Sequence, residues 1–148
     1  MSLKEKINED LNTALKSKDT VRIETLRSIR AEILKMDKSG MNREMNADEE
    51  IQLLSKQAKM RKESIELFQN AGRNDLVDKE QSQLDIISEY LPKQMTPEEA
   101  GTVVDNILKE TGITDPKDFG KLMGEVMKQL KGKVDGKIIQ ELVKSRLG

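Results

Sequence analysis

Hydrophobic residues recur at intervals of three and four along the first part of the chain, the spacing of one face of an α-helix. Residues 2–17 place Leu3, Ile7 and Leu11 on such a face, and the polar stretch KSKD then interrupts it. The same periodicity returns over residues 20–37 and stops at the polar segment KSGMNREMN. The pattern therefore predicts two helices followed by a loop.

A longer helix is predicted from Asn46, which forms a capping box with Glu49, to about residue 71. Two apolar rows run along it, and two rows favour two packing partners, so we expect this to be the central helix of the N-terminal part. Gly72 can end it in the left-handed conformation, and Asn74 and Asp75 start a fourth helix that Pro92 ends. The first row contains Ile51, Leu54, Ala58, Ile65 and Phe68. The second, with its members seven residues apart, contains Leu53, Met60 and Leu67.

Two prolines within the stretch LPKQMTP mark a domain boundary, which predicts domains over residues 1–93 and 94–148. Beyond it, Thr96, Pro97 and Glu99 form the start of a helix that stops at Gly112. Asp115-Pro116 begins the next helix and Gly132 closes it, and Asp135 caps the last. We therefore expect an all-α fold, with about four helices in the N-terminal domain and three in the C-terminal one.

Composition narrows the chemistry available to this chain. The 148 residues are 36% charged and contain no cysteine and no histidine. Disulfides, thiol nucleophiles, Ser-His-Asp triads and nearly all zinc sites are thereby excluded. No apolar run approaches the roughly 20 residues of a membrane span, and the opening MSLKEKINED is not typical of a signal peptide. We expect a cytoplasmic protein without a membrane partner, metal or cofactor.

Charge is unevenly distributed along the chain. Residues 121–148 hold seven basic and three acidic side chains, a net charge of +4, which leaves −5 for residues 1–120. A basic end on a nearly neutral protein favours an anionic partner. The alternative is that these lysines only solvate an exposed helical bundle.

A helical wheel of residues 116–131 separates the side chains into two arcs. Glycine within a helix costs about 1 kcal/mol, and its benefit is a bare backbone that another backbone can approach closely. That neighbour is either a ligand or another helix of the same fold. The arc predicted to face the core contains Phe119, Leu122, Met123, Val126, Met127 and Leu130. The opposing arc contains Lys117, Gly120, Lys121, Gly124, Lys128 and Lys131.

The following GKVDGK turn continues this basic surface with Gly132, Lys133, Gly136 and Lys137. A low cationic surface near a helix N-terminus suits a sugar-phosphate backbone, and structured RNA is often recognised by shape and phosphates alone. The chain has only three aromatic residues, which argues against stacking of single-stranded bases. The arc of lysine and glycine, together with this turn, is therefore the predicted RNA-binding site.

Three segments resemble the YqeY family, a bacterial group of helical proteins related to the C-terminal tail of GatB, a subunit of the tRNA-dependent Asp/Glu amidotransferase. They are ESIELFQNAGRNDLVDKE (63–80), EYLPKQMTPEE (89–99) and DFGKLMGEVMKQLKGKVDGK (118–137). Their order matches over essentially the whole chain, and GKVDGK is similar to the GKxSGK turn of the GatB tail, with Asp135 in place of serine. The resemblance implies a region 1–93 particular to the group, a tail-like region 95–148, and tRNA binding by residues 120–137.

The resemblance also implies a link to carbon–nitrogen ligation with glutamine as amido-N-donor. The GatB catalytic core and the glutaminase subunit have no counterpart in this chain, and it contains no GxxxxGK phosphate loop. The leading hypothesis is thus a tRNA-binding accessory module without an active site of its own, whose partners are tRNA or another structured RNA. The alternatives are a protein–protein adaptor that docks on an amidotransferase or another translation protein, and a genuine amidotransferase component.

A second basic stretch, KQAKMRKES, lies within the predicted long helix. Lys56, Lys59 and Lys62 share a face there with Glu63 and Glu66. Pairing between residues four apart, or a solvated or partner-facing surface, is favoured over a second RNA site. Arg73, just after this helix, is expected to tie the turn between helices together rather than to contact a ligand.

Overall fold

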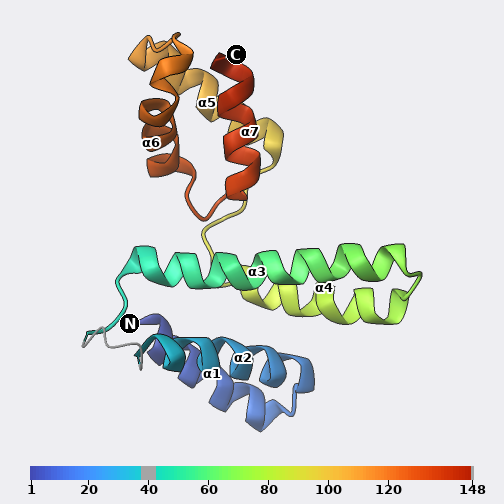
Figure 1. Cartoon of the computed structure of the whole chain (residues 1–148). Helices are drawn as coiled ribbons and strands as arrows, with labels where there is room; N and C mark the ends of the chain where they lie inside the picture. Colours follow the sequence, from blue (N-terminus) through green and yellow to red (C-terminus); the bar gives the residue numbers. More distant parts are fainter. Residues whose placement is uncertain (38–42, 148) are drawn as a thin grey trace. The chain divides into compact units, whose positions relative to one another are not determined.

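The computed structural model describes residues 1–37 and 43–147, and within them it contains helices and no strand (Figure 1). The prediction of an all-α fold is confirmed. Residues 38–42 of the expected loop lie outside the described residues. The elements are α1 (Leu3–Ser17), α2 (Thr20–Asp37), α3 (Ala47–Asn70), α4 (Asn74–Ser88), α5 (Pro97–Thr111), the 3₁₀ turn η1 (Pro116–Asp118), α6 (Phe119–Leu130) and α7 (Gly136–Leu147).

The chain divides into two compact units, Met1–Leu91 and Pro92–Gly148, and each has its own hydrophobic core. The first unit contains α1 to α4 and the second contains α5 to α7. We refer to them as unit 1 and unit 2.

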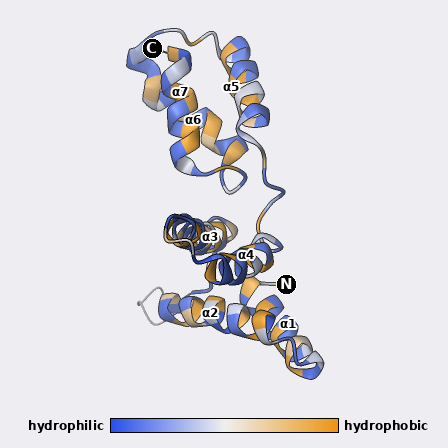
Figure 2. Ribbon diagram, turned by 90° about the vertical axis from the view of Figure 1, so that its right-hand side faces the viewer, coloured by the Kyte–Doolittle hydropathy of each residue, from blue (hydrophilic) through white to orange (hydrophobic). Residues whose placement is uncertain are grey.

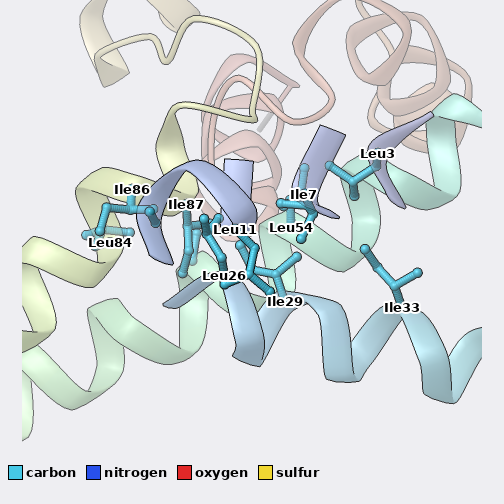
Figure 3. Packing of buried hydrophobic residues seen from close by; sticks show 12 residues of the cluster. Leu3, Ile7, Leu11, Leu26, Ile29, Ile33, Leu54, Leu84, Ile86 and Ile87 are labelled. Atoms are coloured by element: carbon cyan, nitrogen blue, oxygen red, sulfur yellow. The ribbon is translucent and has the colours of Figure 1, made fainter. Parts of the chain in front are cut away.

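Unit 1 consists of two helical hairpins packed as two layers, α1 with α2 and α3 with α4 (Figures 1 and 2). Its core lies where the hairpins meet, and Ile7, Leu26 and Ile29 are completely buried there (Figure 3). The apolar sides of α1 and α2 both face this core. Burial of aliphatic side chains is therefore the main stabilising contribution to the unit.

Helix starts follow the caps that the sequence contains. The Asn46 side chain accepts from the N–H of Glu49 at 2.9 Å, and the Glu49 side chain accepts from the N–H of Asn46 at 3.1 Å. Thr96 and Glu99 form the same reciprocal pair at the start of α5. These bonds satisfy N–H groups that have no partner within the helix, so the predicted capping boxes are confirmed.

The start of α4 is as predicted, whereas its end differs from the prediction. Asn74 is the first helical residue, and the position before it is occupied by Arg73, whose guanidinium binds the carboxylate of Asp75 at 3.1 and 3.2 Å. Arg73 therefore ties the turn together, as expected. The helix ends at Ser88 rather than directly before Pro92, and Glu89, Tyr90 and Leu91 continue the chain in turns whose N–H groups donate to the carbonyl three residues earlier.

The expectation that α3 is central is wrong. α3 packs mainly against α4 and to a smaller extent against α2, and only Leu53 of its second apolar row packs against the core of unit 1. Met60 is 51% exposed and Leu67 is 68% exposed. The two-layer arrangement explains the difference, because a helix of an outer layer buries only the side that faces the other hairpin and its own partner.

Unit 2 packs α5, α6 and α7 around Val104, Leu122 and Val143. α5 and α7 come close at Gly101, where an added Cβ atom would lie 3.1 Å from the guanidinium of Arg146. The Arg146 side chain continues past this glycine and donates to Asp105 at 2.7 Å. A small residue on α5 thus lets a long α7 side chain cross the helix and pair with it.

Candidate nucleic-acid interface

The predicted basic helix is shorter than expected at its N-terminal end. Asp115 caps a 3₁₀ turn, η1, through a bond from the N–H of Lys117, and α6 begins only at Phe119. Lys117 therefore precedes α6 and does not extend its wheel, which corrects the prediction for this residue. Its side chain is exposed.

Gly120 and Gly124 lie on an exposed face of α6. A Cβ atom added to either residue would have no neighbour within 4 Å. Within unit 2, no other helix therefore packs on these glycines, and tight helix packing inside this unit does not explain them. The bare backbone of α6 is open between the two positions.

Lysines surround this opening. On a helical wheel Lys121 and Lys128 lie on the same side of α6 as the two glycines, and both are exposed. Lys128 pairs with Glu125 at 3.1 Å, so part of its charge is balanced locally. Lys131 and Lys133 are half-buried, and Lys137 at the start of α7 is exposed.

Gly132 follows the end of α6 as part of a tight turn rather than as the helix cap that was predicted. Lys131 has φ −56° and ψ 126°, Gly132 has φ 78°, and the N–H of Lys133 donates to the carbonyl of Leu130 at 2.9 Å. These values define a type II β-turn, whose third position requires a positive φ and so favours glycine. The turn directs the chain from α6 toward α7.

The segment that precedes α5 holds this turn in place. The side-chain amide of Gln94 donates to the carbonyl of Gly132 at 2.7 Å, and the N–H of Met95 donates to the carbonyl of Lys133 at 2.8 Å. Two backbone acceptors are thereby occupied, while the lysine side chains take part in neither bond. The turn is consequently anchored to residues 94 and 95 and presents its charges from a fixed backbone.

Gly136 is the first residue of α7, and a Cβ atom added there would also meet nothing within 4 Å. The carboxylate of Asp135 accepts from the N–H of Lys137 at 3.1 Å, which confirms its role as a cap. Among residues 1–37 and 43–147, no group of three acidic side chains is placed to hold a metal ion. The features of this surface are lysines, open glycines and a helix start.

Sequence reasoning missed a cluster of ionisable groups in unit 1. Arg22 binds the carboxylate of Glu89 at 2.8 and 3.1 Å, and the Tyr90 hydroxyl donates to Asp10. The ammonium of Lys6 lies 5.3 Å from the centre of the Tyr90 ring, in the range of a cation–π contact. These side chains line an open hollow of about 390 Å³. Their separation along the chain hid the cluster, and they are paired with one another, which is typical of a structural network.

The pKa of the Tyr90 phenol should lie well above that of an ordinary tyrosine. Its burial, and then its hydrogen bond to Asp10, raise the pKa of the phenol. Because the folded state favours the neutral phenol, this contribution to stability is complete at neutral pH and declines as pH rises above about 10, the unfolded value. Tyr90 is the only tyrosine and the chain has no tryptophan, so tyrosinate absorbance reports on this group alone.

In denaturant, we expect the tyrosinate absorbance to appear near the pKa of an ordinary tyrosine. In the folded protein, it should appear only at a clearly higher pH. Tyr90→Phe should remove the part of the alkaline stability loss that this residue causes. A folded protein whose tyrosine ionises at the ordinary pH would contradict the packing of Tyr90 against Asp10.

Curated relatives match this chain over most of its length. One, from Pyrenophora tritici-repentis, is named "Altered inheritance of mitochondria protein 41, mitochondrial" and is 34% identical over 148 residues, covering 97% of this chain and 80% of the relative. A protein of the same name from Lachancea thermotolerans is 31% identical over 112 residues, covering 74% of this chain and 60% of the relative.

The names of these relatives contradict the cytoplasmic location expected from the sequence, because they describe mitochondrial proteins. That expectation was based on the absence of a signal peptide and of an apolar span, neither of which distinguishes the cytoplasm from the interior of an organelle. Within the described residues, no helix is long and apolar enough to cross a membrane.

A protein-family model described as "Yqey-like protein" matches residues 4–147. The match covers both units, including the capped helix starts of α3 and α5 and the GKVDGK turn. The resemblance seen in the three sequence segments is confirmed: the chain belongs to the YqeY family.

Proposed function

We propose that the chain is an RNA-binding helical protein, and that the backbone of a structured RNA such as tRNA lies against α6 and the GKVDGK turn of unit 2. The observation that carries this proposal is the open backbone at Gly120 and Gly124, with lysines beside it and none of the described residues of unit 2 covering it. Two glycines weaken α6, so an exposed bare backbone needs a reason outside the fold.

Charge supports an anionic ligand at this surface. Among the described residues, Lys117, Lys121 and Lys137 are exposed and form no ion pair within 4 Å. Each can reach a phosphate without first breaking a bond inside the protein. The anchored turn fixes Lys133 and the start of α7 relative to one another, and a fixed set of cations loses less entropy on binding than mobile side chains do.

The form of the surface favours a folded RNA over a single strand. Stacking of unpaired bases requires aromatic side chains, and the only aromatic residue of unit 2, Phe119, is half-buried against its core. Phosphate contacts and a close backbone approach need no such platform. The proposal assigns RNA binding to this chain and no step of amide transfer.

Lys121→Glu combined with Lys137→Glu should strongly weaken tRNA binding by the full chain. Both side chains are exposed, so the substitutions leave the core untouched. Removing two charge-assisted hydrogen bonds to phosphate, each about 1.5–3 kcal/mol, predicts a decrease in affinity of at least about 100-fold. The slope of log affinity against log salt should also fall by about one for each phosphate that is no longer neutralised. Filter binding or fluorescence anisotropy with bulk tRNA measures both quantities.

The matched control is Lys59→Glu combined with Lys62→Glu, which changes the charge by the same amount on exposed positions of α3. We expect this variant to bind tRNA nearly as well as the parent chain. Equal losses in both variants would show only a general charge effect, and an unchanged affinity in the first variant would place any RNA site elsewhere. A single-stranded oligonucleotide of the same length should bind more weakly than tRNA.

A further inference from the structure

The outer half of the α3·α4 hairpin has no buried core. No residue from 59 to 82 is buried, although this range contains the second half of α3 and the first half of α4. Figure 1 shows the hairpin continuing beyond the ends of α1 and α2. Arg61 and Glu80 join the two helices by an ion pair at 3.1 Å. Because helices in proteins are stabilised mostly by packing, we expect another surface to cover this half of the hairpin.

Its exposed side carries an apolar row, formed by Leu53, Met60 and Leu67, which we call the α3 row. Leu53 is half-buried because one side of it packs against the core of unit 1, whereas Met60 is 51% exposed and Leu67 is 68% exposed. Their spacing of seven residues is that of a coiled-coil seam, so the row keeps to one side of a helix that is about 36 Å long. A second helix laid along the row would contact Met60, Leu67 and the part of Leu53 that remains exposed.

Charges beside the α3 row change sign at its middle. Lys56 and Glu63 lie within about 60° of Met60 on the same side of the helical wheel. Lys59 and Glu66, further round the helix, repeat the order of a base followed by an acid. Within the part of the chain that the structure describes, none of these four forms an ion pair, so the predicted pairing between residues four apart does not occur.

We propose that a second copy of this chain covers the α3 row, with the two α3 helices antiparallel and a two-fold axis near Met60. A two-fold interface requires a surface that is complementary to itself. The row meets this requirement, because reversal about Met60 places Leu53 opposite Leu67 and Met60 opposite Met60. The same reversal brings Lys56 beside Glu63 of the second copy.

The charge order favours the antiparallel arrangement over a parallel one. In a parallel pair the two-fold axis would run along the helices and would leave Lys56 and Glu63 of the two copies on opposite sides of the seam, where they could not pair. An unrelated partner helix would need neither a symmetric row nor a sign change at its centre. The pattern is thus better explained by self-association than by an unrelated protein. The row belongs to unit 1, so this proposal is independent of RNA binding by unit 2.

Sedimentation velocity of the full chain over a wide concentration range tests the proposal. We expect a concentration-dependent change from the monomer mass of 16.8 kDa to twice that mass. Met60→Glu should increase the dissociation constant at least about tenfold, since it sets two carboxylates against each other at the axis. Leu15→Glu, at a position of α1 that is 43% exposed, is the matched control and should leave the dimer intact. Circular dichroism should show both variants folded.

Charge exchange and crosslinking test the orientation. Lys56→Glu and Glu63→Lys should each weaken the dimer several-fold, and the double variant should restore it. Because the chain has no cysteine, Leu53→Cys and Leu67→Cys each introduce a single thiol. Oxidation should link the two variants when they are mixed and should link neither to itself.

Three results would overturn the proposal. They are a monomer at every concentration, an unchanged dimer in Met60→Glu, and self-crosslinking of Leu53→Cys alone, which would indicate parallel helices.

Discussion

Leu122→Ala should unfold unit 2 at a much lower denaturant concentration while unit 1 stays folded. Leu122 is completely buried in the core that α6 forms with α5 and α7. Truncating a buried leucine costs about 2–5 kcal/mol, because less apolar surface is buried and a cavity remains. A unit of this size has a total stability of only about 3–9 kcal/mol. One substitution can therefore remove most of it.

The position of the single tyrosine allows both units to be followed in one sample. Tyr90 lies in unit 1 and the chain has no tryptophan, so tyrosine fluorescence reports on unit 1, whereas far-ultraviolet circular dichroism reports on the helices of both. In Leu122→Ala we expect part of the dichroism signal to disappear early and the fluorescence transition to stay in place. Ile29→Ala, in the core of unit 1, should move the fluorescence transition instead. Transitions that shift together in both variants would show that the units unfold as one.

Local signals predicted most of the helix boundaries. Asn46 with Glu49, and Thr96 with Glu99, announce helix starts because each pair satisfies N–H groups that every helix leaves without a partner. Gly112 ends α5 in the left-handed conformation for an equally local reason, since glycine has no Cβ atom to oppose it. Features that depend on a few adjacent residues can thus be read from sequence alone.

Features that depend on contacts between distant residues could not be read in this way. The role of Gly101 follows from the passage of Arg146 over α5, and the two residues are 45 positions apart. The Tyr90 cluster joins α1 and α2 to the end of α4. The α3 row was recognised as apolar, but periodicity cannot tell whether a partner covers it, so its expected burial was wrong.

The candidate RNA site contains features that could be predicted from the sequence and features that could not. The exposed face of α6 at Gly120 and Gly124 follows from periodicity, and the structure adds that none of the described residues of unit 2 covers it. The 3₁₀ turn that separates Lys117 from α6, and the anchoring of the following turn by Gln94, were not visible in the pattern. Both depend on hydrogen-bond geometry, which a helical wheel does not contain.

Gly120→Ala combined with Gly124→Ala should stabilise unit 2 and weaken its binding to tRNA. Alanine fits at both positions, because the added Cβ atoms meet nothing within 4 Å and neither glycine has a positive φ. Gly124 is inside α6, where the exchange gains about 1 kcal/mol, and Gly120 gains less because it lies in the first turn. If a sugar-phosphate backbone lies against this opening, two methyl groups displace it, and overpacking costs about 1–3 kcal/mol. We expect an affinity loss of on the order of tenfold.

The opposite signs of the two effects make this variant informative. A substitution that merely damaged the fold would lower stability and binding together, whereas here the unfolding midpoint rises as affinity falls. Gln129→Ala is the matched control. Gln129 is exposed on α6 but lies across the helix from Gly120 and Gly124, so its substitution should not change tRNA binding. A stabilised Gly120→Ala/Gly124→Ala variant that binds tRNA as the parent does would show that the open backbone of α6 is not where RNA lies, whatever the lysines contribute. A Gly120→Ala/Gly124→Ala variant less stable than the parent would contradict the observation that an added Cβ atom has room at both positions.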